Sequence, residues 1–365
     1  MKKIFAICII IIVFLGFGAC KTNGNQINLT EISQLHTGSR TVDVYVKDDV
    51  LYALDLDYGL YIYNISNISA PTSLGTFRDS YTFSHAFCYR KELIFIADYE
   101  DKLEIVNVSN PSIPQIIGQY QESDSGVEHF GSTNLHVIGD LVLLASQYEG
   151  LEIIDVEDPM NPVKIGSYYD GLSINVVYAI ENLVFIREMG GSFKILDISD
   201  PTSLIEIYHC MEVNVGQNFF VMDNLLYVPD SDFGIRIFDI TDPANTNKIG
   251  EKQIDGNCMK CVIEERGTHI YAYISAEEEG LFILDVTYPE NIQEIAQYND
   301  GGQSFSLFIQ NDLLFVAEFA AGLEILQIDE IEETEVTPSL EAFFVILGLF
   351  LMLVVRQRRE SRANL

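Results

Sequence analysis

The sequence predicts an all-β fold, a seven-bladed β-propeller of four-stranded blades. A six-residue segment that alternates apolar side chains recurs seven times along the 365 residues. Its copies begin at residues 60, 103, 151, 193, 235, 281 and 323. The spacing of roughly 42 to 48 residues between copies is the length of a four-stranded propeller blade.

Each repeat contains four short segments with the composition of β-strands. Apolar and β-branched residues dominate them, turn residues separate them, and no helical period is present. Asp-Pro pairs such as Asp158-Pro159 mark the turn between the third and fourth segments. In the third repeat the strands are predicted at residues 134–138, 141–145, 151–156 and 163–168.

The two ends of the repeat region indicate how the ring closes. The seventh repeat stops at Ile328 and lacks a fourth strand. A segment with the character of a fourth strand, residues 28–35, precedes the first repeat. We therefore expect this N-terminal strand to complete the last blade and to remove the exposed edges, which gives a propeller over residues 27–328.

The third strand of the repeat, Leu151-Glu-Ile-Ile-Asp155, resembles the repeat of the LVIVD family, and the resemblance runs from about residue 40 to residue 328. It implies a surface-exposed propeller and brings no catalytic residues. Asn64, Asn107 and Gln327 stand where the family has Asp. The absence of tryptophan argues against WD40 repeats and sialidase-type Asp boxes.

The N-terminus has the pattern of a signal peptide, which we predict over residues 1–20. Lys2 and Lys3 precede an apolar run at residues 4–17 that is short for a membrane span. Gly18-Ala19-Cys20 resembles the end of a lipobox and makes Cys20 a candidate for lipidation. Ordinary cleavage nearby is the alternative.

The C-terminus predicts an anchor in three parts: an acidic linker (329–341), an apolar helix (342–355) and a basic tail (356–365). At about 1.5 Å per residue the helix spans roughly 21 Å, less than a ~30 Å hydrocarbon core. It is either a transmembrane helix or a sorting signal that is removed, and its layout is similar to the sorting signals of archaeal surface proteins. Both alternatives place the basic tail in the cytoplasm and the propeller on the extracellular face of the cell membrane.

The charge of the chain excludes one class of partner. The net charge is −33, and such a surface repels phosphate backbones, so nucleic acid is not an expected ligand. Sequons make Asn64, Asn67 and Asn107 candidate glycosylation sites of an exported chain. A fourth sequon, at Asn28, falls in the closing strand, where a glycan fits badly.

Acidic residues recur directly after the second strand of the repeats, and these turns share one face of a propeller. They predict a ring of carboxylates, for which a hard cation such as Ca²⁺ is the candidate cofactor. The alternative is that each carboxylate accepts backbone N–H groups in its own turn. The candidate ligands are Asp55, Asp57, Asp98, Glu188, Asp230, Asp232 and Glu318.

Residues with catalytic chemistry are few, and no known catalytic motif is present. His85 and His136 are predicted in first strands, nearest the axis. Cys258 and Cys261 have CxxC spacing, but residues three apart on a strand point to opposite faces, which favours packed thiols.

These observations favour a non-enzymatic, membrane-anchored module that binds a protein or glycan partner outside the cell. Two other hypotheses stay open. One is a hydrolase or lyase with its site in the axial channel, because propellers host such sites and fold does not settle function. The other is a structural protein of the cell envelope that depends on calcium.

Overall fold

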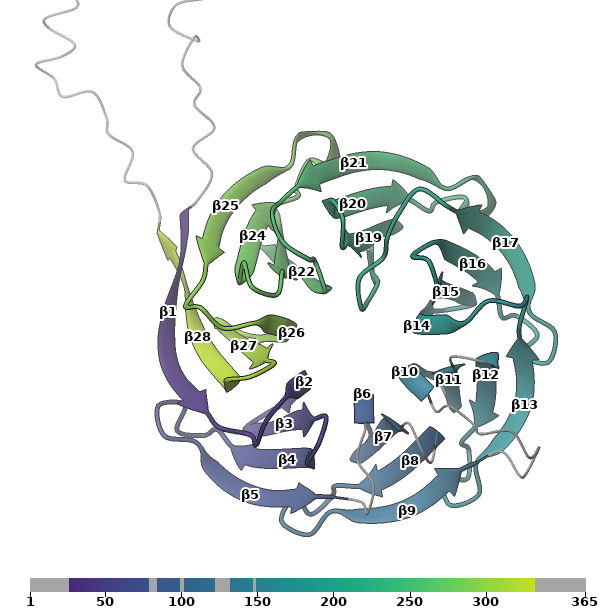
Figure 1. Ribbon diagram of the computed structural model, residues 1–365, viewed down its shortest axis with the longest axis horizontal. Coiled ribbons are helices and arrows are strands. Elements are labelled where there is room, and N and C mark those ends of the chain that lie inside the picture. The colour runs from purple at the N-terminus through teal and green to yellow at the C-terminus, as the bar shows by residue number, and fades with distance from the viewer. Residues whose placement is uncertain (1–25, 79–83, 99–101, 122–131, 147–148, 332–365) are drawn as a thin grey trace, which may run out of the picture. The chain divides into compact units, whose positions relative to one another are not determined.

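The computed structural model describes residues 26–78, 84–98, 102–121, 132–146 and 149–331. These residues form seven four-stranded antiparallel sheets around a common axis, as Figure 1 shows. The predicted seven-bladed β-propeller is confirmed. The first strand of each blade lies nearest the axis and the fourth lies on the outer rim.

Blades 1 to 3 are built from consecutive strands. Blade 1 contains β2 (Thr41–Lys47), β3 (Val50–Asp55), β4 (Gly59–Asn64) and β5 (Thr72–Phe77). Blade 2 contains β6 (Ser84–Arg90), β7 (Leu93–Asp98), β8 (Lys102–Asn107) and β9 (Gln115–Tyr120). Blade 3 contains β10 (Ser132–Ile138), β11 (Leu141–Ser146), β12 (Gly150–Asp155) and β13 (Val163–Tyr168).

Blades 4 to 6 follow the same plan, and in blades 5 and 6 a short 3₁₀ helix precedes the fourth strand. Blade 4 contains β14 (Ile174–Ile180), β15 (Leu183–Glu188), β16 (Phe193–Asp197) and β17 (Ile205–Cys210). Blade 5 contains β18 (Phe220–Met222), β19 (Leu225–Asp230), β20 (Gly234–Asp239), η1 (Pro243–Asn245) and β21 (Asn247–Gln253). Blade 6 contains β22 (Lys260–Arg266), β23 (His269–Ser275), β24 (Leu281–Asp285), η2 (Pro289–Asn291) and β25 (Gln293–Tyr298).

Blade 7 combines strands from the two ends of the propeller. Its order is β1-β28-β27-β26, so the N-terminal β1 (Gln26–Leu35) supplies the outermost strand. The other three strands are β26 (Ser304–Gln310), β27 (Leu313–Glu318) and β28 (Gly322–Ile331). The predicted closure is confirmed, and β28 runs on to Ile331 rather than ending at 328.

The predicted terminal segments lie outside the described residues. These are the signal peptide at 1–20 with Cys20, the helix at 342–355 and the basic tail at 356–365. Among the residues that the structure describes, no helix has the length and apolar character needed to cross a bilayer. The compact unit that contains the propeller runs from Ile27 to Glu330.

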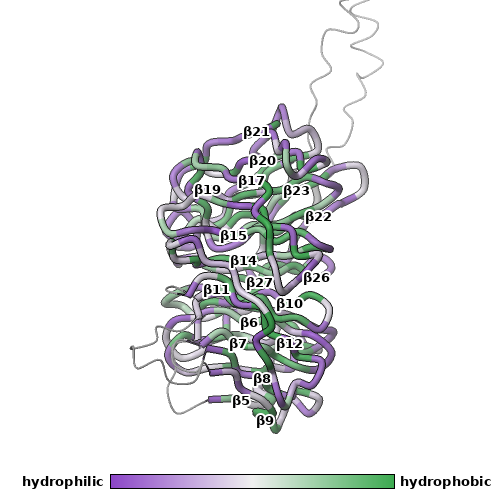
Figure 2. The backbone as a smooth tube through the Cα atoms, turned by 90° about the vertical axis from the view of Figure 1, so that its right-hand side faces the viewer, coloured by the Kyte–Doolittle hydropathy of each residue, from purple (hydrophilic) through white to green (hydrophobic). Residues whose placement is uncertain are grey.

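The hydrophobic core lies between neighbouring blades rather than within one blade. One cluster joins Phe95 and Leu103 of blade 2 to Leu144 and Ile154 of blade 3, all at most 2% exposed. Figure 2 shows apolar stretches running through the strands. Each blade therefore buries its two faces only when both neighbours are in place.

The outer rim adds a contact that repeats from blade to blade. A glycine in the fourth strand packs on the carbonyl oxygen of a proline in the next blade, as Gly166 packs on Pro201. At the closing seam, the boundary between blades 7 and 1, the rim has a hydrogen bond instead of a glycine contact. The Ser33 hydroxyl donates to the carbonyl oxygen of Ile68 at 2.8 Å. The glycine pairs are Gly75 with Pro111, Gly118 with Pro159, Gly166 with Pro201 and Gly250 with Pro289.

Replacing Gly166 with Ala should destabilise the propeller, because the added Cβ overlaps a backbone oxygen that cannot rotate away. We expect a loss of about 1–3 kcal/mol, the usual cost of overpacking, measured from the urea midpoint of unfolding. The matched control is Ser167→Ala at the exposed neighbouring position. Equal midpoints for the two variants would show that the rim contact does not constrain the blades.

Candidate functional site

A cavity of about 340 Å³ lies where the first strands of the blades meet, and all seven blades contribute to its lining. Most of the lining residues come from the beginnings of first strands, and each blade contributes between one and three residues. The repeat therefore builds a shared site in which the backbone is constant and the side chains differ from blade to blade. The lining includes Asp43, His85, Thr133, Asn134, Asn175, Arg187, Gln217, Lys260, Phe305, Ser306 and Phe319.

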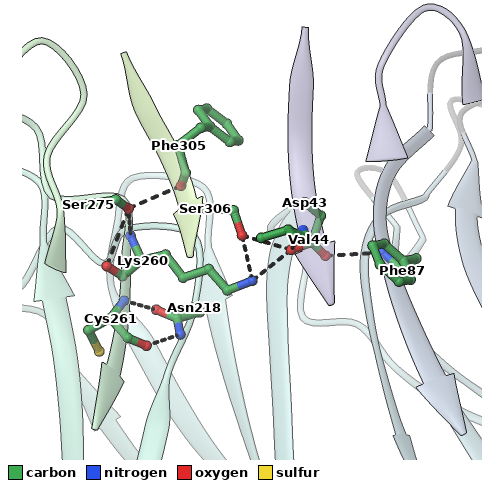
Figure 3. Close-up of polar contacts among 9 residues, drawn as sticks. All are labelled: Asp43, Val44, Phe87, Asn218, Lys260, Cys261, Ser275, Phe305 and Ser306. Carbon is green, nitrogen blue, oxygen red and sulfur yellow. Dashed lines mark hydrogen bonds and ion pairs between the residues drawn. The ribbon is translucent and has the colours of Figure 1, made fainter. Parts of the chain in front are cut away.

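One wall of the cavity contains an ion pair between Lys260 and Asp43, and Ser306 hydrogen-bonds to both residues (Figure 3). The three residues come from three different blades. The Lys260 ammonium of blade 6 donates to Asp43 Oδ1 of blade 1 at 2.8 Å and to Ser306 Oγ of blade 7 at 2.9 Å. The Ser306 hydroxyl in turn donates to Asp43 Oδ1 at 2.8 Å. This network spans the seam where the ring closes, on its inner side.

Other residues that correspond to Asp43 in the repeat also bond to the next blade. Asn218 of blade 5 accepts from the N–H of Cys261 at 2.9 Å and donates to its carbonyl at 2.8 Å, as Figure 3 shows. Asn134 of blade 3 accepts from the N–H of Val177 in blade 4 at 3.0 Å. These side chains fix the spacing of the first strands and hence the width of the cavity.

The opposite wall, in blade 4, carries polar atoms that have no partner in the described part of the chain. The Nε of Arg187 and the Oδ1 of Asn175 are buried and form no hydrogen bond among the described residues. Burial lowers the pKa of Arg187 from its ordinary value, and no carboxylate of the described segments forms an ion pair with it. A ligand that supplies an anionic acceptor and a donor fits this wall.

Neither Arg187 nor Lys260 was singled out by sequence reasoning, although Arg187 leaves a signal. Arg187 pairs with Val176 at a strand position where blades 1, 3 and 6 carry the apolar residues Leu54, Ala145 and Ile274. A charged residue at an apolar strand position is therefore the pattern that could have identified this wall.

The two histidines predicted near the axis differ in their surroundings. His85 lines the cavity. His136 packs against the Tyr178 ring, with centroids 4.7 Å apart, and burial lowers the pKa of its imidazole to about 4. His136 is not part of the cavity lining.

Asp55, a predicted cation ligand, is fully buried and accepts four backbone hydrogen bonds. The N–H groups of Ser39 and Arg40 donate to its Oδ2, both at 2.8 Å. Those of Asp57 and Tyr58 donate to its Oδ1 at 3.0 and 2.9 Å. The carboxylate thus organises its own turn and the preceding loop.

The other members of the predicted ring also contact neighbours in their own blade or an adjoining loop, with Glu318 as the exception. Glu318 Oε2 is buried and has no hydrogen-bond partner among the described residues. Most of the recurring carboxylates therefore have local partners, and the cation ring stays a prediction. The pairs are Asp57 with Arg40, Asp98 with Ser84, Glu188 with Lys194, Asp230 with Arg236 and Asp232 with Asn214.

The remaining sequence candidates have simple surroundings. Cys258 and Cys261 are fully buried and free, and burial raises the pKa of the Cys258 thiol to about 12. Asn64 and Asn107 each accept an N–H two residues ahead, whereas Asn67 is exposed. Glycosylation of these three asparagines stays a prediction.

Comparison with known proteins identifies the repeat. The family model described as "LVIVD repeat" matches six stretches that together exceed half of the chain. They fall in blades 1 to 6 and leave out blade 7, whose strands come from both ends of the propeller. The matched residues are 38–79, 92–122, 131–170, 175–212, 216–251 and 270–300.

Among solved structures, the crystal structure of the computationally designed Ika8 protein is similar, with a TM-score of 0.58 and 9% identity. The match covers 83% of this chain and all of that one, and at this identity it shows the fold alone. No curated protein matches the chain.

Replacing Lys260 with Met should lower the free energy of unfolding by about 1–3 kcal/mol, because it leaves the largely buried Asp43 without its cation. The measurement is the urea midpoint of the full chain in detergent. Lys47→Met is the matched control, since Lys47 pairs with Asp48 in solvent and should change stability by less than about 0.5 kcal/mol. A similar small effect at Lys260 would show that the seam does not depend on this pair.

Proposed function

We propose that this chain, which belongs to the LVIVD repeat family, is a non-enzymatic binding propeller whose axial cavity takes an acidic sugar residue of a glycan. It does so at the extracellular face of the cell membrane. The sequence patterns at the two ends support this address: a signal peptide, Cys20 as a lipidation site, and a helix at 342–355 as the membrane anchor.

The observation that carries the proposal is the pair of buried polar atoms on the blade 4 wall. An unpartnered buried donor or acceptor costs about 1–3 kcal/mol, and a ligand that bonds to both recovers this cost. The guanidinium of Arg187 matches a carboxylate in geometry and charge, while Asn175 Oδ1 accepts from a hydroxyl. An acidic sugar offers both groups on one ring.

The rest of the lining favours a sugar over an apolar peptide anchor. Amide and hydroxyl side chains, among them Thr133, Asn134 and Gln217, face the cavity together with the rings of Phe305 and Phe319. Amides and hydroxyls match sugar hydroxyls, and the rings match the apolar face of a sugar. A volume of about 340 Å³ lies at the lower end of the usual range for small-ligand sites, about 300–1,000 Å³.

The net charge of the molecule limits which acidic ligands we expect the cavity to bind. With a net charge of −33, the surface repels polyanions at long range, so recognition of an acid depends on the local cation. Arg187 has no competing carboxylate within the described residues, whereas Lys260 is engaged by Asp43. We therefore infer that a single carboxylate is recognised at the blade 4 wall.

The test uses the full chain in detergent on an array of carboxylated glycans and matched neutral glycans. We expect binding to a carboxylated glycan and at least tenfold weaker binding of Arg187→Gln, because the charge-assisted hydrogen bonds are lost. The control is Arg78→Gln, an exposed arginine outside the cavity, which should bind as the unaltered chain does.

Three outcomes would overturn the proposal. They are a blank array with folded protein, binding that Arg187→Gln leaves intact, and binding of peptides in place of glycans on a parallel peptide array. Shortened or unsaturated products after incubation would instead identify a hydrolase or lyase at the same cavity.

A further inference from the structure

At the boundary between blades 3 and 4, oxygen atoms of four side chains surround the ammonium of Lys194. The Lys194 ammonium lies 2.8 Å from Glu188 Oε1, 3.2 Å from Glu206 Oε2 and 3.3 Å from the Tyr168 hydroxyl. It also forms an ion pair with Asp170. Three carboxylates and a phenol thus surround one built-in cation.

The boundary between blades 6 and 7 repeats this arrangement with one change. Tyr298 ends β25 as Tyr168 ends β13, and Asp300 follows it by two residues as Asp170 does. Glu318 ends β27 as Glu188 ends β15. The position of Lys194 in the third strand is occupied by Glu324, which pairs with Val316 as Lys194 pairs with Ile186. Two of the three carboxylates thus have counterparts, and the cation is replaced by a further carboxylate.

The side chains at this second boundary converge. One carboxylate oxygen from each of Asp300, Glu318 and Glu324 lies within 4.8 Å of the other two. Glu318 is 3% exposed and Glu324 is 1% exposed. The Oε2 atoms of both are buried without a hydrogen-bond partner among the described residues, and the Tyr298 hydroxyl donates to Glu324 Oε1 at 2.5 Å.

Without a cation, the buried carboxylates of Glu318 and Glu324 at the boundary between blades 6 and 7 have no compensating positive charge among the described residues. Burial, together with the charges of Asp300 and Glu31, raises the pKa of both Glu318 and Glu324 to about 7. Within the described segments no lysine or arginine forms an ion pair with these carboxylates. Buried carboxylates of this kind are normally paired or bound to a metal.

We propose that a divalent cation of the calcium type binds between Asp300, Glu318 and Glu324, in the place that the Lys194 ammonium takes in blade 4. Calcium binds carboxylate oxygens at about 2.3–2.6 Å, so oxygens on opposite sides of one ion lie up to about 5 Å apart. The three carboxylate oxygens lie within 4.8 Å of one another, close enough to share one ion. The ion ties the loop that leaves blade 6 to two strands of blade 7.

The experiment measures thermal unfolding of the full chain in detergent, first with EDTA and then with Ca²⁺ alone. A hundredfold excess of Ca²⁺ over its dissociation constant should raise the melting temperature by about 5 °C. Equilibrium dialysis should give one Ca²⁺ per chain at this site.

Glu324→Lys recreates the charge arrangement of blade 4 and gives the sharpest comparison. This variant should lose the calcium shift and melt in EDTA no lower than the unaltered chain in EDTA. If it fails to fold, Glu318→Gln serves instead and should bind Ca²⁺ at least tenfold more weakly. Glu251→Gln, an exposed acidic residue of blade 5 outside every candidate cation site, is the control and should keep the full shift.

The absence of a calcium shift in the unaltered chain, or an equal shift in Glu324→Lys, overturns the proposal. Higher stability at pH 6 than at pH 8 with no response to Ca²⁺ would show that Glu318 and Glu324 share a proton instead of a metal.

Discussion

Closure of the ring is the constraint on which this molecule depends, because every blade buries its apolar faces only against its neighbours. A chain has two ends and a ring has none, so the first and last blades must be held together by contacts rather than by a connecting loop. Pairing of β1 with β28 does this within blade 7. On the inner side Lys260, Asp43 and Ser306 join three blades, and on the rim Ser33 bonds to Ile68 of blade 1.

The repeat separates the scaffold from the variable chemistry. Apolar strand positions and the rim glycines recur because each blade meets the same neighbour geometry. Positions that face the axis or a blade boundary are free to differ, so one boundary carries Lys194 where another carries Glu324. The charge of a boundary therefore differs between repeats while the strand pairing stays the same.

The sequence predicted the fold almost completely, since a period of about 43 residues, four strands per period and an incomplete last repeat leave one arrangement. In the third repeat the predicted strands agree with β10 to β13 to within two residues. The sequence predicted the candidate site poorly. The repeat shows at which positions acidic residues recur, but it does not show what their side chains contact. Asp55 and Glu318 follow the same pattern, yet one accepts four N–H groups and the other has a buried oxygen without a partner among the described residues. Arg187 and Asn175 lie on the paired strands β15 and β14, but only the arrangement of the seven blades places them at a shared cavity.

The carboxylates of Asp300, Glu318 and Glu324 lie at blade 7, so a cation bound between them affects closure of the whole ring. Blade 7 is the one blade whose outer strand is not joined to it by a turn, so β1 is held there by its contacts rather than by a turn. A cation between the loop leaving blade 6 and the strands β27 and β28 stabilises the blade that receives β1. Few protein ligands give weak calcium binding, and extracellular modules work at about 10⁻⁴–10⁻³ M. Closure of the propeller would then depend on the medium outside the cell, where the proposed export places it.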